Sequence, residues 1–255
     1  MIEITSSSNS KYKYVKSLTQ KKMRKKYSEY TVEGTKSVND ALNSSKTVSS
    51  IFVSNTFYNS ESFNYPSNIP IYCVTDEIFP GMCDTKNPQG ILACIKIENT
   101  NNFIPDTNKS YIYCDSINDP GNLGTIIRTA DAAGFGGVLL SPDCVDLYSP
   151  KVVRSSMGSF FNTDIITDIS HEMIKQYSNN FQLIGGALRE NTSDYRVPDY
   201  KIPTIIIVGN EANGISDEIL EICKCVKIPI LGKAESLNAG VAAAILMYEV
   251  VRQRY

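Results

Sequence analysis

Near its end the chain reads Ile228-Pro229-Ile230-Leu231-Gly232-Lys233-Ala234-Glu235-Ser236-Leu237-Asn238 and passes without a break into the apolar segment 239–251. A short apolar strand, a loop that carries a glycine, and a helix that is apolar on almost every side are indicated. Terminal helices of globular proteins are usually amphipathic and frayed. We therefore expect other parts of the protein to cover this helix, and the polar loop in front of it to serve a function.

The composition is that of an ordinary globular protein of 255 residues with a net charge of −2, long enough for one large domain or two smaller ones. It contains no uninterrupted apolar run of about 18 residues and no signal-peptide core, so we expect a cytoplasmic protein without a membrane partner. Its seven cysteines form no CxxC pair, which argues against a disulfide framework and against a metal site. The single histidine, His171, is interpreted as a surface residue, which disfavours chemistry that needs a histidine base.

Positive charge is concentrated in the first 30 residues, which contain eight lysines and arginines and only two acidic residues, Glu3 and Glu29. The densest part of this region contains Lys21, Lys22, Arg24, Lys25 and Lys26. Four tyrosines are interleaved with the cations, at positions 12, 14, 27 and 30. A surface of this kind meets phosphates and can stack on bases, although a solvated basic helix gives the same pattern.

The rest of the chain divides into two α/β regions. Strands are expected at 30–33, 50–53, 69–74 and 91–97, with helices at 35–42 and 76–82, and they form a compact unit. The polar segment 98–109 lacks periodicity and is predicted to be a linker between a first domain, 1–97, and a second domain, 110–255. Short apolar strands at 111–114, 138–140, 182–185, 204–208 and 226–230 then alternate with helices, which indicates a parallel sheet covered on both faces.

Ligands of open parallel sheets collect at loops beyond the carboxyl ends of the strands, and the first such loop leads into a helix. Asp119 and Pro120 are typical of an N-cap and a first helical residue. Arg128 lies roughly 100° from the apolar Ile127 on the helical wheel and so points away from the core. It is either a solvated helix residue or a clamp for a phosphate or carboxylate. The GxGxxG spacing of a dinucleotide site is absent.

Two further loops carry polar residues. Gly209-Asn210-Glu211, with Gly214 shortly after, indicates tight backbone geometry around a carboxylate at a strand tip, and a plain turn is the alternative. In the third loop, Ser236 precedes the last helix, and a helix cap alone would explain it.

Taken together and in order, the three loops resemble the three motifs of the SpoU-type (TrmH-type) RNA ribose 2′-O-methyltransferases of the SPOUT superfamily. The first motif matches at 122–134, the second at Gly209-Asn210-Glu211 with Gly214, and the third from Ile228-Pro229-Ile230 through Ser236-Leu237-Asn238 to Tyr248-Glu249. The first region is similar to the small substrate-binding domain of many members, on Glu33-Gly34 and Pro88-Gln89-Gly90-Ile91. The resemblance thus covers nearly the whole chain.

This resemblance implies an α/β protein with a small N-terminal substrate-binding domain and a C-terminal parallel-sheet domain closed by a trefoil knot. It implies S-adenosylmethionine as methyl donor, a homodimer whose interface includes the knotted region, and RNA as substrate. The extra domain favours ribosomal (23S) RNA over transfer RNA. A non-catalytic RNA-binding or ribosome-assembly protein that keeps the fold is the alternative from another class.

The resemblance also assigns residues. The catalytic set is Arg128, Asn122, Glu211, Ser236 and Asn238. Cofactor contacts are expected from Gly186, Ala187, Gly209, Ile228, Ile230 and Leu237, and RNA contacts from Lys21, Lys22, Arg24, Lys25 and Lys26. Members of the family are described as using the arginine as a general base, but guanidinium is not normally deprotonated in proteins. We therefore hypothesise that a charged Arg128 pairs with the phosphate beside the target ribose and stabilises the developing alkoxide, while phosphate or water takes the proton.

Two positions depart from the usual family pattern. Ala212 stands where many members have glycine, and Ala239-Gly240 stands where Val-Ser usually follows Ser-Leu-Asn. These residues are small, so the knot is still expected to pack. The departures bear on detail at the rim of the cofactor site.

Overall fold

A computed structural model describes residues 2–60, 63–98, 103–189 and 192–255. By their contacts, the described residues fall into two units. The first contains 2–98 together with 148–161, and the second contains 103–147 together with 162–255. Part of the predicted linker, 99–102, lies outside the described residues.

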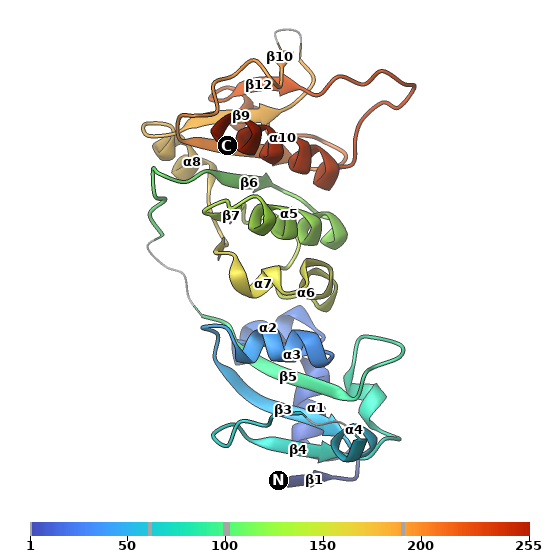
Figure 1. The fold of residues 1–255 in the computed structure, drawn as a ribbon. Helices are drawn as coiled ribbons and strands as arrows, with labels where there is room; N and C mark the ends of the chain where they lie inside the picture. Colours follow the sequence, from blue (N-terminus) through green and yellow to red (C-terminus); the bar gives the residue numbers. More distant parts are fainter. Residues whose placement is uncertain (1, 61–62, 99–102, 190–191) are drawn as a thin grey trace. The chain divides into compact units, whose positions relative to one another are not determined.

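The first unit is built on a five-stranded mixed sheet with the order β1-β4-β3-β5-β2 (Figure 1). The β1, β4 and β3 strands are parallel, whereas β5 runs antiparallel to both β3 and β2. The strands are β1 (Ile2–Ile4), β2 (Glu29–Glu33), β3 (Val48–Ser54), β4 (Ile71–Val74) and β5 (Ile91–Lys96). The helices are α1 (Ser10–Ser17), α2 (Lys21–Tyr27), α3 (Thr35–Leu42), α4 (Asn55–Ser60) and the 3₁₀ turn η1 (Phe79–Met82). The expected elements of residues 30–97 are therefore present, and β1, α1, α2 and α4 are added to them.

The basic N-terminal region folds as the two helices α1 and α2. Asn9 caps α1 by accepting a hydrogen bond from the backbone N–H of Lys11 at 2.8 Å. Tyr12 and Val15 lie three residues apart on one face of α1 and are buried, in a core shared with Phe52, Tyr72 and Leu92. The lysines of α1 lie on the outer face because the apolar positions recur at helical spacing.

The segment 148–161 belongs to the first unit by its contacts, although it follows two strands of the second unit in the sequence. It contains α6 (Pro150–Ser156) and begins α7 (Ser159–Asn162), and α6 packs on β2. The rings of Tyr148 and Phe160 lie 4.9 and 5.7 Å from the ring of Tyr30. Arg154 forms a 2.7 Å salt bridge with Asp84. The first unit is thus assembled from two separate stretches of chain.

The second unit is built on a seven-stranded parallel sheet with the order β10-β12-β9-β11-β6-β7-β8. Its strands are β6 (Tyr111–Asp115), β7 (Gly137–Leu140), β8 (Ile165–Ile166), β9 (Gln182–Gly186), β10 (Ser193–Asp194), β11 (Thr204–Gly209) and β12 (Lys224–Lys227). The five expected strands are present. The last ends at Lys227, three residues before the predicted end at Ile230, because Pro229 has no N–H to donate to a ladder.

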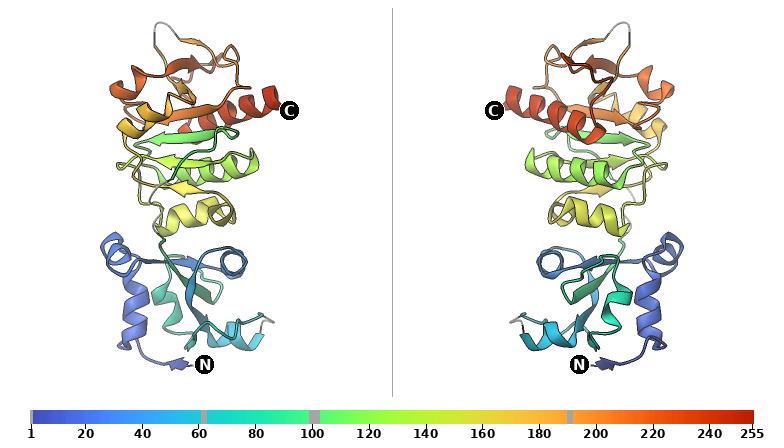
Figure 2. Two further views of the ribbon diagram at one scale, coloured as in Figure 1. Left: turned by 90° about the vertical axis from the view of Figure 1, so that its left-hand side faces the viewer. Right: turned by 90° about the vertical axis from the view of Figure 1, so that its right-hand side faces the viewer.

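Helices cover both faces of this sheet, as Figure 2 shows from the side. The helices α5 (Pro120–Ala132) and α10 (Ala239–Arg254) contact each other and lie on one face. The helices α8 (His171–Tyr177) and α9 (Asp217–Leu220) lie on the other, where Ile174 and Ile219 join a core with Tyr113 and Ile207. This three-layer arrangement confirms the predicted α/β class.

The last helix is covered on one side only. In α10, Ala243, Leu246 and Met247 are fully buried, whereas Val241 and Tyr248 are 46% and 48% exposed. The loop before it, 228–238, extends away from the sheet (Figure 1), and Leu231 is 98% exposed. In the single chain, one side of α10 is therefore covered, while its other side and the loop 228–238 are open. No helix among the described residues is long and apolar enough to span a membrane.

Candidate active site

The site lies at the carboxyl edge of the parallel sheet, where the loops after β6, β9, β11 and β12 gather. Because every strand of this sheet runs in the same direction, the carboxyl ends meet at one edge. Gly209 at the end of β11 pairs in register with Asp115 at the end of β6. The loop after β6 and the loop after β11 therefore leave the sheet side by side.

Three of the predicted catalytic residues form a hydrogen-bonded chain. Asn122 in the first turn of α5 is buried, and its side-chain N–H donates to a Glu211 carboxylate oxygen at 2.7 Å. The Asn122 side-chain oxygen accepts from the Asn238 amide at 2.7 Å. Asn238 also caps α10, since its Oδ1 accepts from the N–H of Val241 at 3.2 Å. Loops that are far apart in the sequence are thereby joined through one buried amide.

Glu211 organises the loop after β6. Its two carboxylate oxygens accept hydrogen bonds from the backbone N–H groups of Asn118 and Asp119, both at 3.3 Å. Partial burial would raise the pKa of Glu211, but the hydrogen bonds from Asn122 and these two amides outweigh it, and the pKa is lowered. Glu211 is thus held as a carboxylate.

Asn210, which was not among the predicted site residues, connects the loop after β11 to the loop after β6. Its side-chain N–H donates to the Ser116 carbonyl at 2.8 Å. Its Oδ1 accepts from the N–H of Ala212 at 2.9 Å and of Asn213 at 3.1 Å. Ser116 has a left-handed backbone, with φ of 57°. The position of Asn210 between a glycine and a glutamate is the sequence signal that would have found it.

A cavity of about 600 Å³ opens among these loops, within the usual range for small-molecule sites. All six residues expected to contact the cofactor line it, and so do three of the predicted catalytic residues. These are Gly186, Ala187, Gly209, Ile228, Ile230 and Leu237, with Glu211, Ser236 and Asn238. Its charged lining also includes Arg189 and Asp217, which form a 2.6 Å salt bridge with each other.

Two glycines of the cavity lining are packed so closely that neither has room for a Cβ atom. A Cβ atom on Gly209 would lie 2.2 Å from the Gly214 carbonyl group, and one on Gly186 would lie 2.9 Å from a Leu246 methyl. The lining combines glycine backbone and apolar side chains with carboxylate, amide and basic side chains. S-adenosylmethionine has a flat adenine and a charged amino-acid end, so the residues present fit this cofactor.

Arg128 and Asn122 do not belong to the cavity lining among the described residues. Asn122 reaches the lining through its bonds to Glu211 and Asn238. Arg128 lies on the exposed side of α5, next to the buried Ile127, as the helical wheel predicted. Its guanidinium is therefore presented to solvent.

The interpretation of His171 as a simple surface residue is wrong. The side chain is 32% exposed and lies between two carboxylates, with Nδ1 2.7 Å from Glu218 and Nε2 3.2 Å from the buried Asp115. Partial burial would lower the pKa of His171, but the hydrogen bonds to Glu218 and Asp115 outweigh it and raise the pKa. Asp115 also accepts from the N–H of Ser216 at 2.7 Å. These partners lie far away in the sequence, so the local pattern around His171 gave no signal.

The predicted RNA-binding cations lie in the first unit and do not behave alike. Lys21, Lys22, Lys25 and Lys26 are exposed on α2. Arg24 is buried, and one guanidinium nitrogen donates to the carbonyls of Leu18 at 2.7 Å and Thr19 at 2.8 Å. We correct its assignment: Arg24 holds the turn between α1 and α2 together. Among the described residues no cluster of three or more His, Cys, Asp or Glu side chains is suited to a metal ion.

Comparisons with known proteins identify the family. Residues 109–248 match the SpoU rRNA Methylase family, and residues 9–93 match the MRM3-like substrate binding domain. The chain is 32% identical to the 23S rRNA (guanosine(2553)-2′-O)-methyltransferase RlmP of Bacillus subtilis, across 98% of this chain and 99% of that protein. It is similar to the crystal structure of an AdoMet-bound rRNA methyltransferase from Sinorhizobium meliloti, with a TM-score of 0.88 and 31% identity over 98% of this chain and 97% of that one.

A third likeness, to the SpoU methyltransferase AviRb from Streptomyces viridochromogenes, has a TM-score of 0.82 and 25% identity over 96% of this chain and 98% of that one. The family match includes the three loops that form the cavity and its hydrogen-bonded rim. The chain belongs to the SpoU rRNA methylase family.

Proposed function

We propose that this protein transfers a methyl group from S-adenosylmethionine to a ribose 2′-hydroxyl in 23S ribosomal RNA. The observation that carries the proposal is the chain of hydrogen bonds from Asn238 through Asn122 to Glu211 at the edge of a cavity suited to the cofactor. The relatives support the choice of RNA, since RlmP and a uridine(2479)-2′-O-methyltransferase of Streptomyces viridochromogenes are both named for 23S rRNA.

Residues of the cavity wall would hold the cofactor. Gly186 and Ala187 after β9, Gly209 after β11, and Ile228, Ile230 and Leu237 in the last loop supply backbone groups and apolar walls. When bound, S-adenosylmethionine supplies an electrophilic methyl group carried on a sulfonium.

The remaining residues position the substrate and stabilise charge. Glu211, Asn122 and Asn238 fix the loops that flank the cavity, and Ser236 lies in its lining. Arg128 keeps its charge, pairs with the phosphate beside the target ribose and stabilises the developing alkoxide, while phosphate or water takes the proton. This assignment is supported by the exposed place of Arg128 on α5, where a polyanion can reach it.

In this proposal residues 1–97 bind RNA, 98–109 form the linker, and 110–255 carry the chemistry, except for 148–161, which pack with the first unit. Lys21, Lys22, Lys25 and Lys26 supply cationic contacts in the first part. The segment 148–161 supports the RNA-binding part through its packing on Tyr30. We place the enzyme in the cytoplasm, where bacterial ribosomal RNA is made.

We further propose a homodimer that includes the last helix and a trefoil knot formed by the chain after β12. The exposed apolar side chains of Leu231, Val241 and Tyr248 support the dimer, because a second copy would remove them from water. The strand order supports the knot, since β12 lies between the earlier strands β9 and β10.

Two alternatives remain testable: a transfer RNA substrate, and a protein that binds RNA without catalysis. Isothermal titration with S-adenosylmethionine, with and without RNA, separates the enzyme from the binding protein, and we expect saturable binding. Absence of binding in both conditions would exclude the enzyme. Mapping 2′-O-methyl groups in the host's RNA with and without the gene identifies the substrate, and loss of a mark in transfer RNA alone would refute the choice of 23S rRNA.

A further inference from the structure

We propose that the exposed lysines of α1 and α2 hold the phosphate backbone of a double-helical RNA segment and do not read unpaired bases. This inference rests on the proposed function, because it specifies which form of RNA the first unit recognises. We call the surface formed by Lys11, Lys13 and Lys16 on α1 and Lys21, Lys22, Lys25 and Lys26 on α2 the basic corner.

The charge of the basic corner is unbalanced in a way that calls for an external anion. Residues 10–27 contain eight basic residues and no acidic one, in a chain whose net charge is −2. At 3.6 residues per turn, the four lysines of α2 fall within an arc of about 140° on one side of that helix. The positive charge of α2 is thus gathered on one face of that helix.

This arrangement is unfavourable for the isolated helix. Lys21 and Lys25, like Lys22 and Lys26, stand four residues apart, where like charges destabilise a helix. Lys21 and Lys22 also occupy the first turn of α2, where the helix dipole favours negative charge and no acidic residue is present. The dipole favours Lys25 and Lys26 in the last turn, but the basic first turn and the two like-charge pairs remain unfavourable, and phosphates placed across the face would relieve the repulsion.

The structure removes most of the aromatic rings that a single-strand site would need. Proteins that bind unpaired RNA stack successive bases on exposed aromatic side chains. Tyr12 and Tyr30 are 4% and 1% exposed, so they cannot stack on RNA. The hydroxyl of Tyr14 donates to Glu29, and its ring meets Tyr27 edge to face at 4.8 Å. Tyr27 is 39% exposed, and Lys26 Nζ lies 5.3 Å from its ring centre.

The backbone that carries the lysines of α2 is also tied in place, which suits a regular lattice of phosphates. Arg24 ties α2 to the carbonyls of Leu18 and Thr19 at the end of α1. Ser28 ends α2 in a left-handed conformation with φ of 50°, and its N–H donates to the Arg24 carbonyl. Lysines on a fixed backbone gain more from charges at fixed spacing, as on an A-form helix, than from a flexible strand that must itself be ordered.

The test compares a blunt 20-base-pair RNA duplex with a 20-nucleotide oligouridine by fluorescence anisotropy over a range of salt. We expect the wild-type protein to prefer the duplex by more than about fivefold. The double variant Lys22→Gln/Lys26→Gln is expected to bind the duplex about 10-fold more weakly at 0.1 M salt, with a salt slope lower by nearly 2. Tyr27→Leu is expected to leave duplex affinity within about twofold, because no base stacks there.

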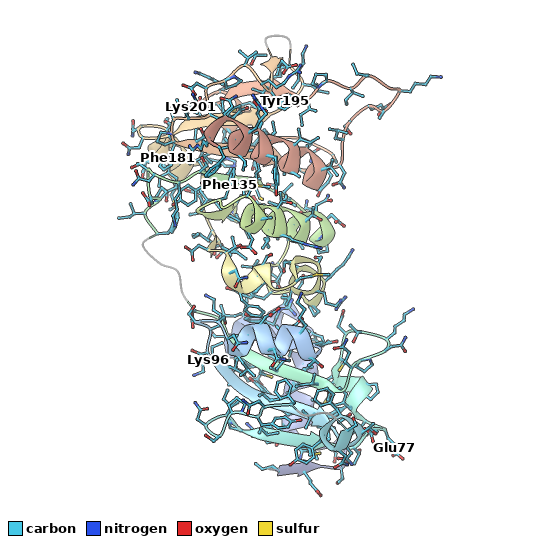
Figure 3. The ribbon with its side chains drawn as sticks, viewed as in Figure 1. Glu77, Lys96, Phe135, Phe181, Tyr195 and Lys201 are labelled. Atoms are coloured by element: carbon cyan, nitrogen blue, oxygen red, sulfur yellow. The ribbon has the colours of Figure 1, made fainter. Side chains whose placement is uncertain are left out.

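The matched control is Lys86→Gln/Lys96→Gln, which removes the same charge from exposed lysines of the first unit outside the basic corner; Lys96 is labelled in Figure 3. It is expected to bind the duplex like the wild type. The proposal would be overturned if both double variants lost the same affinity for the duplex. It would also be overturned if the protein bound oligouridine as tightly as the duplex and Tyr27→Leu weakened that binding. Titration of the same preparations with S-adenosylmethionine reports separately on the second unit, so a failure of the proposed function is recognised independently.

Discussion

Asn122 shows how much of this site depends on single side chains. Its amide donates to Glu211 and accepts from Asn238, so one buried residue joins three loops. A leucine of similar size would break both bonds and leave the exposed Glu211 and Asn238 side chains to water, so the three loops would no longer be joined. Arg128, to which we assign the stabilisation of the alkoxide as a proposal, takes no part in these hydrogen bonds.

We expect Arg128→Lys to lower the methylation rate at saturating RNA by about 100-fold, because lysine keeps the charge but lacks the planar fork that holds a phosphate in two places. Single-turnover kinetics measures the rate, and titration with S-adenosylmethionine is expected to give unchanged affinity. Arg196→Lys, at an exposed arginine of the second unit, is the control. A rate near that of the wild type in Arg128→Lys would exclude a need for the fork.

His171 gives a prediction about pH. Its pKa in the folded protein is raised above the ordinary value of 6.5, so its stabilising contribution is complete below that value and is lost as the pH rises through the folded pKa. His171→Gln should therefore lower the free energy of unfolding by about 0.5–1 kcal/mol at pH 6, and by less at pH 9. Urea unfolding at the two pH values measures this. If His171→Gln lowered the free energy of unfolding equally at pH 6 and pH 9, the raised pKa of His171 would be contradicted, since the chain has no other histidine.

At the scale of elements, the end of β11 is the most constrained point of the site. Gly209→Ala would place a Cβ 2.2 Å from the Gly214 carbonyl group and force the turn 210–214 open. We expect a destabilisation of about 2–3 kcal/mol and loss of S-adenosylmethionine binding, measured by thermal unfolding and titration. Gly232→Ala, where a Cβ meets nothing within 4 Å, should behave like the wild type. A Gly209→Ala protein that binds the cofactor normally would show that this turn does not shape the cavity.

Elements with strong periodicity could be predicted from the sequence, and contacts between distant elements could not. The apolar strands and the capped helix α5 follow from local patterns, and so does the outward direction of Arg128. The burial of Tyr12 and Tyr30 depends on residues far away in the sequence: Tyr12 shares a core with Phe52, and the ring of Tyr30 packs against Tyr148. Arg24 was misassigned because its partners are backbone carbonyls, which no composition rule reveals. Of the site, the three loops were recognisable, and the second of them contains Asn210, whereas the Asp115–His171 pair emerged only from the fold.

At the scale of the whole molecule, the proposed dimer makes a prediction about association. Val241 and Tyr248 stand two helical turns apart on α10 and form one exposed apolar stripe. We expect the wild-type protein to sediment as a dimer at micromolar concentration, and Val241→Asp/Tyr248→Asp to sediment as a monomer, because charges would then have to be buried. Val197→Asp, at another exposed apolar residue, should remain dimeric. A wild-type monomer would refute the proposal.

The return of residues 148–161 to the first unit has a consequence for biosynthesis. Domains of growing chains generally fold from the N-terminus as soon as they are complete. Here the ring of Tyr30 remains without Tyr148 and Phe160 until residue 161 has been translated, roughly several seconds after residue 98. During that interval the first unit is an unfinished intermediate that exposes an aromatic surface. Ribosome-bound nascent chains ending before residue 148 should therefore recruit chaperones that chains extending past residue 161 release.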